Sequence, residues 1–89
     1  MQNLPQKKIS SSPNELTIYP NPAKDRIYLS SNFKGQANVY IYNRLGMLLT
    51  TAMMCQGQAF IDLRQLPQGV YFIKLMNDEG YTAKAFVKE

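Results

Sequence analysis

The fold is decided by the stretch LPQGVYFIKLM, residues 66–76. Its first four residues fit a type I turn, with Pro at the second position and Gly at the fourth. The apolar run that follows fits a strand, in which successive side chains point to opposite faces. These two faces consist of Tyr71, Ile73 and Leu75 on one side and Val70, Phe72 and Lys74 on the other. Because both faces are largely apolar, we predict a strand in the middle of a sheet or beneath a partner.

Similar short segments, rich in β-branched and aromatic residues and separated by Gly, Pro and Asn, run through the chain on both sides of this strand. We predict strands over residues 16–19, 26–30, 37–42, 48–54, 59–63, 70–76 and 82–87. No stretch has a helical apolar period over the length of a helix. A single sheet would leave one face in water, whereas two packed sheets bury an inner face each. The sequence therefore predicts an all-β, seven-stranded antiparallel β-sandwich, with Val39 and Ile41 pointing inward together.

Two four-residue turns share one design, NRLG at residues 43–46 and NDEG at residues 77–80. Asn opens each as a type I turn, and Gly closes it where a positive φ is needed. A connection this short permits only antiparallel neighbours. We therefore predict one hairpin between the third and fourth strands and another between the last two.

Tyr71 follows directly on the turn at residues 66–69. In immunoglobulin-like sandwiches, a tyrosine at such a corner donates a hydrogen bond to upstream backbone and locks the crossover. Two interpretations stay open for Tyr71, this hydrogen bond or a plain core aromatic.

Composition excludes most enzyme classes. The 89 residues are 45% hydrophobic and 18% charged, which indicates one small globular domain. With no histidine and one cysteine, the chain cannot build a Ser/His/Asp set, a Cys/His pair, a disulfide or an ordinary zinc site. We assign no catalytic residue, metal or cofactor. Cys55 is predicted to be a small apolar filler, with an intermolecular disulfide as the alternative, and Asp78 and Glu79 are predicted to be solvated turn residues.

The net charge of +4 raises the question of nucleic-acid binding, because basic chains attract phosphate. Lys7 and Lys8 belong to the leading segment, and residues 14–89 carry eight basic and six acidic groups, a balance of +2. That is an ordinary solvated surface, so we predict no nucleic-acid partner. The apolar runs are far shorter than the 18 or more residues of a membrane-spanning helix.

Residues 1–13 are predicted to be a flexible linker, because Gln, Asn, Lys, Pro and the run Ser10–Ser12 bury little apolar surface. The folded domain is then expected over residues 14–89. The first residues lack the apolar core of a signal peptide. We therefore expect any export signal to lie outside this chain, and the chain to be part of a longer protein.

The segment YPNPA, residues 19–23, is the least generic part of the sequence. Each proline removes a backbone donor and pushes the preceding residue toward extended geometry. We expect the first strand to end here at a rigid corner, with the Asn21 side chain closing an Asx turn.

Four segments in order carry a family resemblance: YPNPA at 19–23, VYIYNRLG at 39–46, DLRQLPQGVYFI at 62–73 and KAFVK at 84–88. Over residues 16–89 the chain resembles the C-terminal sorting domain of cargo proteins of the type IX secretion system. The matching positions are Pro20, Asn21 and Pro22 in the opening motif, Gly46 in the hairpin, Gly69 and Tyr71 in the central motif, and Lys84 and Lys88 in the basic ending.

The resemblance implies an immunoglobulin-like sandwich at the end of a larger secreted protein of a Gram-negative bacterium. The cargo would pass from the periplasm across the outer membrane through a translocon with its cargo receptor. A sortase-like cysteine peptidase would then remove the domain, leaving the cargo anchored to anionic lipopolysaccharide at the cell surface or released. We expect the cut in the polar linker, because a peptidase needs an extended and accessible backbone.

A folded sorting signal would be recognised by its surface. We expect a receptor to dock on an edge strand or on the face near the last hairpin, using Lys84 or Lys88; alternatively, these lysines protect an edge from aggregation. The isolated domain could also form a homodimer through an edge strand. A second function stays open, an immunoglobulin-like or fibronectin-like adhesion module that binds a sugar or a protein.

Overall fold

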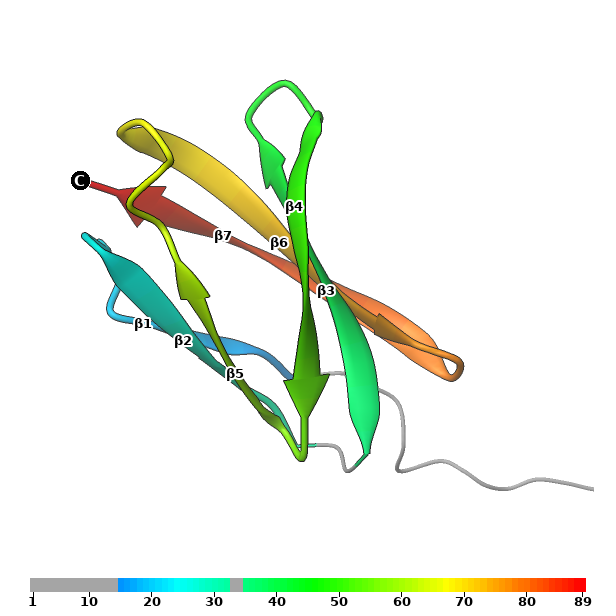
Figure 1. The fold of residues 1–89 in the computed structure, drawn as a ribbon. Coiled ribbons are helices and arrows are strands. Elements are labelled where there is room, and N and C mark those ends of the chain that lie inside the picture. Colours follow the sequence, from blue (N-terminus) through cyan, green and yellow to red (C-terminus); the bar gives the residue numbers. More distant parts are fainter. Residues whose placement is uncertain (1–14, 33–34) are drawn as a thin grey trace, which may run out of the picture.

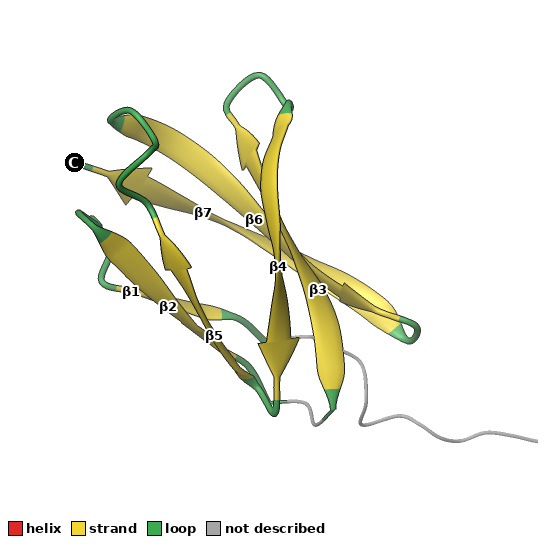
Figure 2. Cartoon of the chain, in the orientation of Figure 1, coloured by secondary structure: helices red, strands yellow, loops and turns green. Residues whose placement is uncertain are grey.

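The computed structural model describes residues 15–32 and 35–89, and all of its regular structure is β-strand (Figure 2). The strands are β1 (Thr17–Tyr19), β2 (Arg26–Ser30), β3 (Gln36–Asn43), β4 (Leu48–Cys55), β5 (Gln58–Asp62), β6 (Gly69–Asn77) and β7 (Gly80–Lys88). Each lies where the sequence predicts it, with bounds that shift by two residues at most. The described part of the chain contains no helix that is long and apolar enough to cross a membrane. The predicted linker at residues 1–13 lies outside the described residues.

The strands follow the order β1-β2-β5-β4-β3-β6-β7, and all neighbours are antiparallel. β4 and β5 share one register pair, Cys55–Gln58, and diverge beyond it (Figure 1). The sheet is thereby divided into two layers, β1-β2-β5 and β4-β3-β6-β7. The predicted all-β, seven-stranded antiparallel sandwich is confirmed, and its architecture is consistent with an immunoglobulin-like fold.

The core lies between the two layers and is built from the inward-facing residue of each alternating pair. Its largest fully buried side chains are Phe86, Ile27, Leu29, Ile41, Met54, Leu63, Ile73, Leu75 and Val39. The inward orientation predicted for Val39 and Ile41 is confirmed. Full burial of side chains of this size stabilises the fold by about 1.5–3 kcal/mol each.

Both predicted hairpins are present. Asn43 Oδ1 accepts hydrogen bonds from the backbone N–H groups of Leu45 at 2.9 Å and Met47 at 3.0 Å. Gly46 has a φ of +87°, which a side chain would disfavour. In the last hairpin, Asn77 Oδ1 accepts from the N–H of Glu79 at 2.8 Å. The Asn side chain therefore opens each turn as predicted, by binding the backbone N–H two residues further along the chain.

β6 lies between β3 and β7, as its two apolar faces predicted. On its inner face Tyr71, Ile73 and Leu75 are buried. On its outer face Val70 and Phe72 each remain 41% exposed. Burial in the core thus explains the apolar residues on the inner face of β6, whereas no layer of the described residues covers those on its outer face.

Candidate recognition surface

The corner at residues 19–23 holds the end of β7. Asn21 Oδ1 accepts a hydrogen bond from the Val87 N–H at 3.0 Å. The Ala23 N–H donates to the Val87 carbonyl at 2.7 Å, and the Glu89 N–H donates to the Ala23 carbonyl at 2.7 Å. We call these three contacts the β7 clasp. They occupy the free backbone groups at the end of an edge strand, which would otherwise be open to pairing.

The Asx turn predicted at Asn21 is wrong. The side-chain oxygen accepts from Val87, 66 residues along the chain, instead of closing a local turn. Both prolines have a fixed φ and lack an N–H, and the peptide bonds preceding Pro20 and Pro22 are cis. Because neither proline can donate, the corner reaches β7 through the Asn21 side-chain oxygen and the backbone N–H and carbonyl groups of Ala23.

Tyr71 forms the tyrosine-corner hydrogen bond. Its hydroxyl donates to the Pro67 carbonyl at 2.5 Å, and the residue is 5% exposed. The ring also stacks on Phe86 of β7, with centroids 5.6 Å apart and planes 25° apart. Tyr71 is therefore more than a plain core aromatic, because its ring packs in the core while its hydroxyl donates a hydrogen bond to upstream backbone.

The four segments of the family resemblance meet at one end of the sandwich. The clasp joins the first segment to the last. Gly69 of the central segment lies opposite Lys88 in the β6–β7 register. Asn43, which opens the turn containing Gly46, lies opposite Tyr71 in the β3–β6 register. Positions that are scattered along the sequence thus form a single structural unit around the end of β7.

The two lysines of the basic ending have different surroundings. Lys84 is exposed, and its Nζ donates to the Leu16 carbonyl at 3.0 Å, which ties β7 to the segment before β1. Lys88 is half-buried, with its Nζ 3.4 Å from a backbone oxygen of Glu89. Each ammonium group therefore has a partner within the domain, and the part of either lysine in recognition stays a prediction.

The described ranges contain no group of three or more His, Cys, Asp or Glu residues that could hold a metal ion. Asp62 and Arg64 form an exposed ion pair at 2.7 Å. The hydrogen bond from the Arg64 guanidinium lowers the pKa of Asp62 to about 2. A carboxylate with that pKa is ionised at neutral pH, so it is poorly suited to general acid or base work.

The environment predicted for Cys55 is wrong, because the thiol is exposed instead of buried. Side chains alternate along β4, and Cys55 points outward like Met53, two residues earlier. Asp78 and Glu79 are exposed in the last turn, as predicted.

Two features of the outer sheet faces were missed by sequence reasoning. Tyr19, Tyr28 and Phe60 form a stacked row across β1, β2 and β5, with centroid separations of 5.7 and 6.2 Å. This row depends on the pairing of β2 with β5, which are not consecutive strands, so only knowledge of the strand order could have revealed it.

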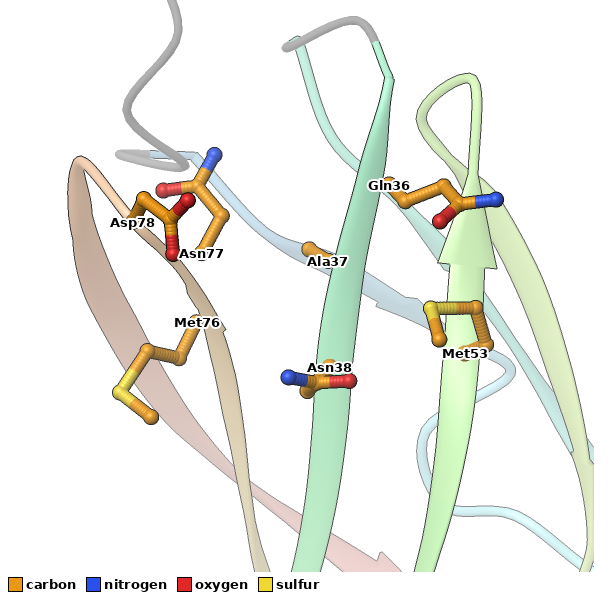
Figure 3. Close-up of a pocket in the computed structure, with 7 residues that line it drawn as sticks. All are labelled: Gln36, Ala37, Asn38, Met53, Met76, Asn77 and Asp78. Atoms are coloured by element: carbon orange, nitrogen blue, oxygen red, sulfur yellow. The ribbon is translucent and has the colours of Figure 1, made fainter.

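The second missed feature is a hollow of about 300 Å³ near the last hairpin. Figure 3 shows Asn38 on β3 between Met53 and Met76 of the neighbouring strands, with Asp78 at the turn. The amide and thioether groups that line this hollow come from three different strands. Sequence reasoning missed the hollow because these residues do not lie together in any one segment of the sequence.

Taken together, the seven antiparallel strands in two layers and the clasped final strand define a small all-β sandwich domain. The chain belongs to the family of secretion system C-terminal sorting domains, whose profile matches residues 17–89. This is the sorting domain of the type IX secretion system, and the predicted resemblance is confirmed.

One similar solved structure is that of PorZ, described as an essential bacterial surface component of the type-IX secretion system of Porphyromonas gingivalis. It superposes with a TM-score of 0.72 at 19% identity and covers 83% of this chain. The aligned region is 11% of the PorZ chain, so the similarity concerns the fold of one part of that protein. Among curated proteins, none matches this sequence.

Proposed function

We propose that this domain is the export signal of a larger cargo protein, which it directs across the outer membrane through the type IX secretion system. A sortase-like peptidase then removes it, and the cargo is anchored at the cell surface or released. The observation that carries this proposal is the family match over residues 17–89, which spans all seven strands. The meeting of all four resemblance segments at one end of the fold supports it.

The physical basis of such a signal is a folded surface. A translocon receptor can recognise sheet edges and faces of the sandwich only after the core has formed. The peptidase requires the opposite, an extended and accessible backbone, and the polar composition of residues 1–13 suits that step. Recognition and cleavage would thus use different parts of the chain.

Export of a foreign passenger tests the proposal. The 89-residue chain is fused behind an inert periplasmic passenger in a bacterium with this secretion system, and surface-exposed or released passenger is measured. We expect the fusion to leave the periplasm and the unfused passenger to stay there. A stably folded fusion that is retained in the periplasm contradicts the proposal.

The predicted docking role of Lys84 and Lys88 is tested with the double variant Lys84→Ala, Lys88→Ala. Because Lys84 also bonds the Leu16 carbonyl, export and thermal stability are measured on the same protein. Reduced export from a stably folded variant supports docking. Normal export from a stably folded variant leaves the lysines with their structural contacts alone.

The alternative function, an adhesion module, is favoured by the exposed aromatic row of Tyr19, Tyr28 and Phe60, since aromatic side chains are common anchors at binding surfaces. Position within a protein separates the two functions. A sorting signal redirects a foreign passenger, whereas an adhesion module binds its sugar or protein ligand wherever it is placed.

A homodimer would use the free edge of β4. This strand, LLTTAMMC, carries no charge and pairs with β5 at Cys55 alone. Long, uncharged edges are prone to pair with another chain. Light scattering of the whole chain and of Thr51→Lys tests this assembly, because a charge at the centre of the edge should abolish any dimer.

A further inference from the structure

The outer face of the four-stranded layer is unusually apolar. Residues opposite each other in antiparallel strands share a face, so the strand registers define two adjoining rows on it. The first row is Leu48, Tyr42, Phe72 and Ala85, and the second is Thr51, Tyr40, Lys74 and Ala83. Val70 and Val87 lie opposite each other beyond the first row. We call these ten side chains the outer face.

Packing among residues 15–32 and 35–89 does not account for the apolar character of this face. Val70, Phe72 and Val87 are each 41% exposed, and the core is complete on the other side of the same strands. A solvated sheet face normally alternates with a polar set. Scattered exposed apolar residues are ordinary, but a contiguous apolar patch marks an interaction site.

Charge on the outer face points to the kind of partner. Lys74 is its only charged side chain, half-buried with its Nζ 5.0 Å from the Tyr81 ring centroid. None of the ten residues of the outer face is acidic; the acidic residues next to β6 and β7 in the chain are Asp78 and Glu79, in the turn that joins these strands, and Glu89 after the end of β7. Covering Lys74 would remove it from water, which is costly unless the covering surface supplies an opposite charge.

We infer that the outer face is the surface that a protein of the secretion machinery covers, with an apolar contact region and a carboxylate opposite Lys74. This inference rests on the proposed function and names the surface that such a partner would read. Val70 and Phe72 lie in the central resemblance segment and Val87 in the last one. Those segments would then combine residues that close the fold with residues that contact the partner.

A second copy of the chain fits this surface less well. Two outer faces packed together would bury both Lys74 side chains against faces that hold no carboxylate. Burial of an unpaired charge opposes such a dimer. A different protein can place the missing carboxylate where it is needed.

Export of the fusion protein tests the inference with matched variants. Phe72→Ser and Lys74→Glu remove the apolar centre and reverse the charge, and Val87→Thr is a nearly isosteric third variant should Phe72→Ser unfold. The controls are Phe60→Ser, on the outer face of the other layer, and Lys24→Glu, in an exposed loop. We expect export to fall about tenfold or more in the first set, as for interface hot spots, from variants that remain folded at the assay temperature. We expect normal export of the controls.

Outcomes for the function and for the surface are separable. If the wild-type fusion stays in the periplasm, the proposed function fails, and this inference fails with it. If the wild type and all folded face variants are exported equally, only the inference fails.

A photo-crosslinking residue at position 72 identifies the molecule that contacts the outer face in whole cells, and the same residue at position 60 serves as the control. A larger envelope protein trapped at 72 but not at 60, and lost in Lys74→Glu, supports the inference. A product of twice the fusion's mass that forms from position 72 and not from position 60, which indicates a second copy on the outer face, or an adduct with lipid overturns the inference.

Discussion

The sandwich has two sides where edge strands of its layers face each other, and these sides are built differently. On one side, the corner at residues 19–23 reaches the end of β7 through the clasp. On the other side, β4 and β5 meet at Cys55–Gln58 and then separate. Figure 1 shows this divergence.

This difference explains what the sequence segments of the family do in the fold. The Pro-Asn-Pro corner and the final strand close one side, which a two-layer sheet leaves open by default. No comparable residues join β4 to β5 in the described chain. The motif positions are therefore concentrated where the end of β7 is held. We call the side closed by the β7 clasp the clasped side and the side where β4 and β5 separate the open side. Mutations should lower the stability of the fold more on the clasped side than on the open side.

The largest effect is expected for Phe86→Ala on the clasped side. Phe86 is 1% exposed and stacks on Tyr71, so its truncation should lower the free energy of unfolding by about 3–5 kcal/mol. The same change at Phe60 on the open side, which is 57% exposed, should cost less than about 1 kcal/mol. Urea unfolding of both variants measures the contrast, and equal losses would refute it.

Removing the Tyr71 hydroxyl should have the next largest effect. Tyr71→Phe keeps the ring but leaves the part-buried Pro67 carbonyl without its donor. We expect a loss of about 1–3 kcal/mol in the free energy of unfolding. Tyr81→Phe is the control, because Tyr81 is exposed. An unchanged stability of Tyr71→Phe would mean that water replaces this hydrogen bond at no cost.

The clasp itself is tested by Asn21→Ala, for which we expect a smaller loss of about 0.5–1.5 kcal/mol. The sharper measurement is amide hydrogen exchange. The Val87 N–H should exchange slowly in the wild type and much faster in the variant, because Asn21 accepts its hydrogen bond.

The open side supplies the internal reference for this exchange experiment. Gln56 N–H bonds to the Gly35 carbonyl on the β3 side, and backbone direction alternates along a strand. The amides of Met53 and Thr51 therefore point to the open edge and should exchange fast in both proteins. Slow exchange there would show that this side is closed in solution.

The smallest effect concerns Asp62 and Arg64 after β5. Their hydrogen bond lowers the pKa of Asp62 from 3.8 to about 2 in the folded chain, so the folded state favours the ionised carboxylate. The resulting stabilisation is present above pH 4 and is lost as the pH falls toward 2. Melting temperatures measured from pH 5 to 2 should fall less steeply in Arg64→Ala than in wild type and Arg44→Ala.

Local rules predicted most of the architecture. Alternation in residues 70–76 identified the buried and exposed faces of β6, because the side-chain period of a strand is fixed by its backbone. The two Asn-opened turns identified hairpins, because their hydrogen bonds lie within four residues. Tyr71 was recognised from its position after a turn.

Non-local contacts could not be predicted in this way. The partners of Asn21 and Lys84 lie 66 and 68 residues away. The aromatic row depends on the β2–β5 pairing. Each requires the strand order, which residue patterns within one strand do not contain.

The clasp also bears on how fast the domain folds. The Asn21 side chain and the Val87 N–H approach each other only after a loop of more than sixty residues has closed. Contacts between such distant residues stabilise the chain late in folding, after the entropy of loop closure has been lost. All-β domains of this kind fold in milliseconds to seconds. If the clasp forms after the transition state, removing the Asn21 hydrogen bond in Asn21→Ala raises the unfolding rate and leaves the refolding rate unchanged.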